Sequence, residues 1–78
     1  MADFDKELDA RDLASPLPVL RAKAALRELQ PGQVLRLLAS DHRTALDVGS
    51  FCKAAGHDLV AQDHQDGVPS FLIRRRAD

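Results

Sequence analysis

The residues of this sequence that could do chemistry gather at one point, Ser15-Pro16-Leu17-Pro18. A side chain at the start of a helix meets unpaired backbone N–H groups and the positive end of the helix dipole, which together favour an anion. A cysteine there would ionise near neutral pH and become a nucleophile. A serine hydroxyl does not ionise unaided. Ser15 therefore decides which covalent chemistry this position can support.

A structural role also suits Ser15, because serine is among the preferred N-cap residues. Pro16 then takes the first helical position, and the Leu17 N–H becomes the expected partner of the Ser15 side chain. A second alternative is that the hydroxyl and the helix N-terminus together hold a small anionic group, either of a ligand or of a partner. Serine catalysis is disfavoured, because no local histidine is placed to act as its base.

The other candidates for chemistry are weaker. Cys52 is the single thiol, and its position beside Phe51 on an apolar helix stripe predicts a buried, inert cysteine. His42, His57 and His64 lack the close spacing of metal ligands, so we expect no metal site and no cofactor.

Basic residues offer two further hypotheses. Arg36 and the run 74–76 could form a nucleic-acid patch, but the chain has no Trp or Tyr for base stacking. We expect a solvated tail instead, and nucleic acid is not a favoured partner. Arg21, Lys23 and Arg27 flank the motif on the first helix, where they could steer an acidic partner toward it.

Length and composition predict one small domain spanning residues 1–78. The chain is 45% hydrophobic and 29% charged, as expected of an ordinary globular protein, and its net charge of −1 selects no class of partner. One cysteine forms no internal disulfide, and no apolar run suits a membrane helix or a signal peptide. We therefore expect a cytoplasmic protein without a membrane partner.

Two segments have the pattern of helices. The first follows Ser15 and ends at Pro31-Gly32, and the second begins after a predicted Ser40-Asp41 cap and ends at Gly56. Apolar stripes mark the buried side of each helix. These stripes are Val19, Ala22, Leu26 and Leu29 in the first helix, and Val48, Phe51, Cys52 and Ala55 in the second.

Four segments have the pattern of strands. Alternation predicts a strand over residues 4–10 with Phe4, Leu8 and Ala10 on the buried side, and residues 34–39 suit a central strand. Residues 57–64 and 68–74 are expected to pair as a hairpin.

The turn of that hairpin is predicted at Gln65-Asp66-Gly67, and Pro69 indicates that the last strand has a free edge. The element order is βαβαββ. Right-handed crossovers then predict an α/β two-layer sandwich, in which two helices cover one face of a four-stranded mixed sheet.

Many of these residues together resemble the TusA/SirA-type sulfur-carrier family of bacteria. The similarity extends over almost the whole chain. Its most specific part is the Pro-x-Pro motif, which stands between a strand with the sequence Leu-Asp-Ala-Arg and an amphipathic helix. The matching residues are Leu8-Asp9-Ala10-Arg11, Leu13, Pro16-Leu17-Pro18-Val19-Leu20, Pro31-Gly32, Ser40-Asp41, Phe51-Cys52, Gly56-His57 and Asp66-Gly67.

The resemblance implies a sulfur-relay function. Members of the family take sulfur from a cysteine desulfurase as a cysteine persulfide, and pass it toward tRNA thiolation, cofactor assembly or sulfur oxidation. It implies protein partners such as a cysteine desulfurase and DsrE-like or rhodanese-like proteins. Ser15 stands at the position of the carrier cysteine, with Pro16, Leu17, Pro18, Arg21 and Lys23 as the expected partner-binding residues.

The sequence departs from the family's pattern around this position. Asp12 stands where glycine is usual, Ala14 where asparagine is common, and His42-Arg43 where Pro-Gly is frequent. Several changes together favour a naturally diverged member over an engineered mutant. Whether the chain is an enzyme stays open, because the nucleophilic cysteine is absent. We expect it to dock on sulfur-transfer partners without carrying a persulfide, and the alternative is an interaction or regulatory module unrelated to sulfur.

Overall fold

The computed structural model describes residues 3–77, apart from the side chain of Gln65. Within this range the chain forms one four-stranded sheet and two helices in the predicted order βαβαββ. Their bounds are β1 Lys6–Asp9, α1 Leu17–Arg27, β2 Val34–Leu38, α2 Thr44–Ala55, β3 Asp58–Gln65 and β4 Val68–Arg74.

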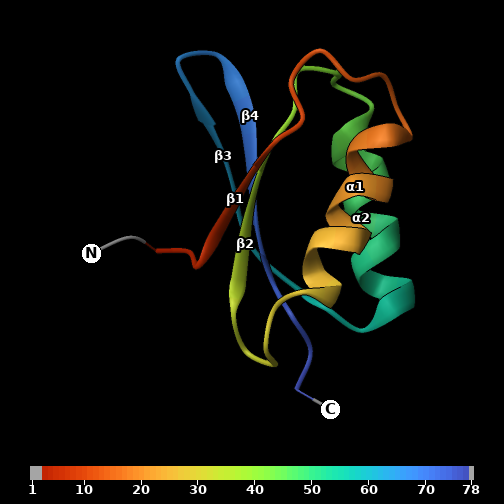
Figure 1. Ribbon diagram of the computed structural model, residues 1–78. Coiled ribbons are helices and arrows are strands. Elements are labelled where there is room, and N and C mark those ends of the chain that lie inside the picture. The colour runs from red at the N-terminus through yellow and green to blue at the C-terminus, as the bar shows by residue number, and fades with distance from the viewer. Residues whose placement is uncertain (1–2, 78) are drawn as a thin grey trace.

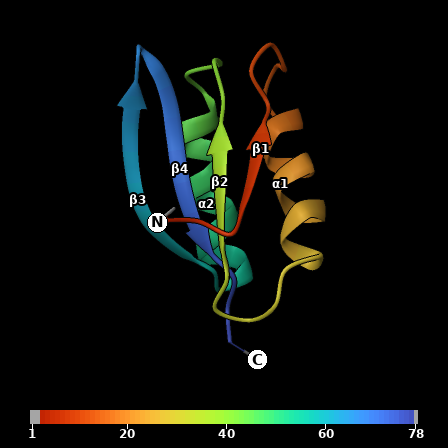
Figure 2. The ribbon, with the colours of Figure 1, turned by 60° about the vertical axis from the view of Figure 1, so that its left-hand side comes forward.

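The sheet is mixed, with the strand order β1-β2-β4-β3. β1 pairs with β2 in parallel, and β4 pairs antiparallel with both β2 and β3. Both helices lie on the same face of the sheet, and the other face has no helix over it (Figures 1 and 2). The predicted α/β two-layer sandwich is confirmed.

The core lies between the sheet and the helices. Alternate side chains of β2 and β4 point toward the helix layer, where they meet the apolar stripes of α1 and α2. Cys52 belongs to this core and is only 4% exposed, as predicted. The largest fully buried side chains are Phe71, Leu26, Leu35, Leu37, Ile73, Val48, Thr44 and Pro18.

The position of β4 corrects the prediction made from Pro69. β4 lies between β2 and β3, so it has no free edge, and β1 and β3 are the edge strands. Pro69 is tolerated because it is the second residue of β4, before pairing with β2 begins at Ser70 opposite Leu38. Its carbonyl still accepts a bond from the Ala39 N–H at 3.1 Å.

Phe4 also lies on a different face from the one predicted. β1 begins only at Lys6, so the alternation of the strand does not extend back to Phe4. The Phe4 ring instead lies 5.4 Å from the guanidinium carbon of Arg36, on the face of the sheet without helices. Leu8 and Ala10 pack in or against the core as expected.

The turns follow the predicted chemistry more closely. Asp66 and Gly67 have φ values of 53° and 81°, the pair of positive angles that a two-residue hairpin turn requires. Gly56 ends α2 with a φ of 79°. α1 ends at Arg27, earlier than the predicted end at Pro31-Gly32. The Glu28 and Leu29 N–H groups donate to carbonyls three residues earlier, so the chain after Arg27 is wound more tightly than an α-helix.

Neither helix in residues 3–77 is long and apolar enough to cross a membrane.

Candidate functional site

Ser15 lies where both helices begin. α1 and α2 start at the same end of the helix layer, the upper end in Figure 1, so the positive ends of their two dipoles point to one region. Ser15 is half-buried at this end, and its peptide bond to Pro16 is cis. The position therefore borders on solvent, as its place in line with the helix stripe predicted.

The predicted N-cap role of Ser15 is wrong. The helix begins at Leu17, with Pro16 in the N-cap position and no side-chain cap. The Leu17 N–H donates to the Ala14 carbonyl at 2.9 Å, so it is not available to the serine. The Ser15 hydroxyl donates instead to the carboxylate of Asp47, in the first turn of α2. Ser15 thus connects the two helix N-termini.

Asp41 holds the backbone at the same position. The Ser15 N–H donates to Asp41 Oδ2 at 2.9 Å, and Arg43 forms an ion pair with the same carboxylate at 2.8 Å. These bonds lower the pKa of Asp41 well below its usual range, with the Arg43 side chain as the largest cause and the Ser15 N–H next. The loop before α2 is therefore fixed against residue 15.

The predicted cap of α2 by Ser40-Asp41 is also wrong. Arg43 occupies the N-cap position, and no side chain caps the helix. The Asp41 carboxylate is used by Ser15 and Arg43, while the Ser40 hydroxyl accepts a bond from the Asp12 N–H at 3.0 Å. Asp12 has a φ of 73°, a left-handed conformation that glycine adopts without a steric penalty. This backbone angle explains why glycine suits the position that Asp12 occupies here.

Asp41→Asn is expected to lower stability in a pH-dependent way. The pKa of Asp41 is depressed in the folded state, so its charged form stabilises the fold above the ordinary pKa of 3.8. That contribution is lost as the pH falls toward the folded pKa. Urea midpoints of parent and variant should therefore differ most at neutral pH and approach each other as the pH falls below 3.8. A difference independent of pH would show that the carboxylate charge has no such role.

Asp47 is the site residue that the sequence reasoning missed. It is 32 residues from Ser15 in sequence, and an acidic residue in a first turn ordinarily needs no explanation beyond the helix dipole. The available signal was topological. Right-handed crossovers on one face make the two helices parallel, and this places their first turns side by side.

The predicted binding residues differ in their exposure to solvent. Pro16 and Arg21 are exposed, and Leu17 is 44% exposed, whereas Pro18 is buried in the core and cannot face a partner. Lys23 is exposed and lines a hollow formed with Phe51, Arg75 and other residues.

Two further apolar side chains stand out near the helix starts. Leu20 is 54% exposed in α1, and Leu46 is 79% exposed next to Asp47 in α2. With Leu17, they place three exposed leucines in the opening turns of the two helices. As part of the proposal made below, we call Ser15, Leu17, Leu20, Arg21 and Leu46 the docking surface.

Cys52 is far along α2 from Ser15, near the other end of the helix. Burial raises the pKa of its thiol, with a smaller contribution from the negative charge of Asp58. A buried thiol with a raised pKa is a poor nucleophile. Cys52 is therefore not a substitute for a cysteine at position 15.

A hollow of about 280 Å³ borders on Asp41, between the start of α2 and the two strands β3 and β4. His42 and His64 both line it. Within residues 3–77, no three His, Cys, Asp or Glu side chains are placed to hold a metal ion. This hollow lies at the same end of the molecule as Ser15, because Asp41 both lines it and accepts the Ser15 N–H.

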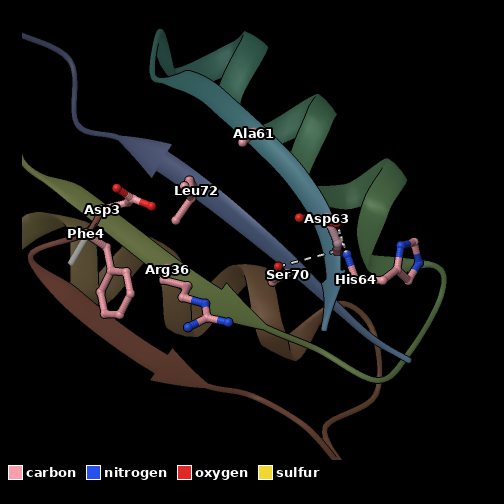
Figure 3. A pocket seen from close by; sticks show the side chains of 8 residues that line it. All are labelled: Asp3, Phe4, Arg36, Ala61, Asp63, His64, Ser70 and Leu72. Carbon is pink, nitrogen blue, oxygen red and sulfur yellow. Dashed lines mark hydrogen bonds between the residues drawn. The ribbon is translucent and has the colours of Figure 1, made fainter. Parts of the chain in front are cut away.

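A larger hollow of about 460 Å³ lies on the helix-free face of the sheet (Figure 3). Arg36 crosses it and pairs with Glu7 at 3.1 Å, and Arg74 pairs with Asp58 at 3.5 Å. Because carboxylates neutralise Arg36 and Arg74, these two arginines do not support the nucleic-acid patch considered in the sequence analysis. The hollow is on the opposite side of the sheet from Ser15. Its lining residues are Asp3, Phe4, Arg36, Ala61, Asp63, His64, Ser70 and Leu72.

Comparison with known proteins decides the family. Residues 6–75 match the sequence profile of the family described as Sulfurtransferase TusA. The chain belongs to the TusA family. A TusA relative, the sulfur carrier protein TusA of Allochromatium vinosum, is 44% identical over 75 residues, which cover 96% of this chain and 99% of that protein.

Further TusA relatives and a solved structure agree. The sulfur carrier protein TusA of Pseudomonas aeruginosa is 39% identical over 74 residues, covering 95% of this chain and 94% of that protein. The crystal structure of a SirA-like protein from Desulfitobacterium hafniense superposes with a TM-score of 0.82 at 27% identity, covering 92% and 99% of the two chains. The resemblance to the TusA/SirA-type family is thus confirmed for both sequence and fold.

Proposed function

We propose that this chain docks on the proteins of a sulfur relay in the cytoplasm without itself carrying a persulfide. The observation that carries the proposal is the hydroxyl of Ser15 at the outer end of the helix layer, in a TusA-family fold. The partners we propose are a cysteine desulfurase and a downstream sulfurtransferase, of the kind that serves tRNA thiolation. Exposed apolar side chains next to Ser15 support a protein partner.

The chemistry of sulfur transfer explains why Ser15 does not carry sulfur. An acceptor thiolate attacks the outer sulfur of the donor's persulfide, forms a new S–S bond and releases the donor cysteine as a thiolate. The Ser15 hydroxyl is hydrogen-bonded to Asp47 and supplies no sulfur for that bond. The single thiol, Cys52, is buried in the core. Neither side chain can therefore receive the outer sulfur.

The same geometry supports docking. Asp41 and Asp47 hold the Ser15 segment in place, so the docking surface is largely preformed. Leu17, Leu20 and Leu46 supply apolar contact area, and Arg21 supplies a positive charge next to it. A partner with an apolar contact patch and an acidic rim would complement this surface.

Isothermal titration of the chain with a cysteine desulfurase tests the docking. We expect Leu20→Glu to weaken binding by at least about tenfold, because it places a charge in an apolar contact. Val60→Glu is the matched control, since Val60 is 47% exposed but lies on β3. Equal effects of the two variants would contradict the assigned surface.

A pull-down from cell extract separates this function from the alternative. Recovery of desulfurases, rhodanese-like proteins or thiolation enzymes supports a place in sulfur relay. Recovery of an unrelated partner through the docking surface, with none of these proteins, would favour an interaction module unrelated to sulfur.

A further inference from the structure

A third hollow, of about 290 Å³, lies at the opposite end of the helix layer from Ser15. It is formed where the second halves of α1 and α2 approach the C-terminal segment, at the lower end of the molecule in Figure 1. Among residues 3–77, its lining has four cationic side chains and no carboxylate. The lining residues are Lys23, Leu26, Arg27, Phe51, Ala55, His57, Arg75 and Arg76.

The segment that brings Arg75 and Arg76 to the hollow is fixed in place. The Arg75 N–H donates to the Gln33 carbonyl at 2.8 Å, and the Arg76 N–H donates to His57 Nδ1 at 3.0 Å. The Arg76 guanidinium also donates to the Ala55 carbonyl at 2.9 Å. Arg76 is exposed, as expected of a solvated tail, whereas Arg75 is half-buried because its backbone pairs with Gln33 beyond β4.

Most basic side chains elsewhere in the described chain have an acidic partner. The five ion pairs of residues 3–77 use Lys6, Arg11, Arg36, Arg43 and Arg74.

Three of the four cations in the third hollow differ from these. Lys23, Arg27 and Arg75 form no ion pair within residues 3–77, although they line one hollow together. The negative ends of the helix dipoles explain the positions of two of the four cations. Arg27 lies in the last turn of α1, and Arg76 donates to the carbonyl of the last residue of α2. They do not account for Lys23, one turn earlier, or for Arg75.

We propose that this hollow binds the diphosphate group of a small molecule. Lys23, Arg27 and Arg75 place three like charges around a volume of about 290 Å³, and a ligand that carries several negative charges in a compact group would offset their repulsion. Arginine forks bind phosphate oxygens in pairs, and three of the four cations are arginines. The volume is near the lower end for small-molecule sites, which suits a compact ligand.

The apolar side chains in the lining indicate that the ligand also has an apolar part. Leu26, Phe51 and Ala55 also line the hollow, and the Phe51 ring centroid lies 5.6 Å from that of His57. An organic group attached to the diphosphate would cover these side chains. The site is independent of Ser15 and of the sulfur relay proposed above.

Titration of the isotope-labelled full chain with pyrophosphate tests the proposal by NMR and calorimetry. We expect saturable binding that shifts the amide signals of the hollow and not those of the docking surface. Lys23→Gln with Arg75→Gln should weaken binding by at least about tenfold, since two of the four charges are removed. Arg11→Gln with Lys53→Gln is the matched control, because it removes the same net charge at exposed positions outside both the hollow and the docking surface.

The outcomes are distinct. Loss of binding in the Lys23 and Arg75 variant, with binding within about twofold of the parent in the control, supports the site. Equal losses would show that only net charge matters and would overturn it, as would no binding by the parent. Tighter binding of an RNA oligonucleotide than of pyrophosphate would also overturn it. Because Arg75 is half-buried, Lys23→Gln alone, at an exposed position, is measured as well and should weaken binding in the same direction.

Discussion

Ser15→Cys is expected to convert this chain from a protein that takes up no sulfur into a sulfur acceptor. The substitution exchanges one atom at the outer end of the helix layer, where two helix N-termini favour an anion. If the fold and the docking surface are those of a sulfur carrier, the missing sulfur atom is the main obstacle. Intact-mass analysis after incubation with a cysteine desulfurase and cysteine should show one added sulfur atom in the variant and none in the parent.

Asp47 provides an internal test of that result. Its carboxylate accepts the Ser15 hydroxyl, so it would also face a thiol placed there and raise the thiol pKa by repulsion between like charges. Adding Asp47→Asn to Ser15→Cys should therefore lower the thiol pKa and speed alkylation at neutral pH. Peptide mapping must place the alkyl group on the introduced thiol, because Cys52 is buried. A thiol pKa that is the same with and without Asp47 would contradict the contact.

Leu37→Ala is expected to cause the largest loss of stability. Leu37 is fully buried in the middle of β2, and truncating a buried leucine costs about 2–5 kcal/mol. A chain of 78 residues has a total stability of only about 4–12 kcal/mol at the usual value per residue. The variant should therefore unfold at a much lower urea concentration, or be partly unfolded without urea.

Leu46→Ala is the matched control for Leu37→Ala. Leu46 is 79% exposed, so the same truncation should change the free energy of unfolding by less than about 0.5 kcal/mol. Urea denaturation followed by circular dichroism measures both variants. Similar losses in the two would show that Leu37 does not lie in the core.

The sequence predicted the arrangement of elements because each element is marked by local signals. The stripe of α1 and the Asp66-Gly67 turn depend on near neighbours in sequence, and both appear as expected. The prediction from Pro69 was wrong because strand order is not a local property. β4 is inserted between β2 and β3 by the pairing of Ser70 with Leu38, which no pattern within β4 reveals.

The site was only half predictable for the same reason. Ser15 could be singled out from the motif that follows it, but its hydrogen-bond partner could not. Asp47 reaches Ser15 from another helix, and Asp41 reaches it from the loop before that helix. The N-cap rule therefore assigned the serine to its own helix, when the packing of two helices offered a stronger acceptor.

Native mass spectrometry of the parent chain with a cysteine desulfurase and cysteine tests the central claim most directly, because one spectrum reports both binding and mass. We predict a complex of the two proteins from which the chain is released at its unmodified mass. A released chain that is heavier by one sulfur atom would contradict the claim that it docks without carrying sulfur.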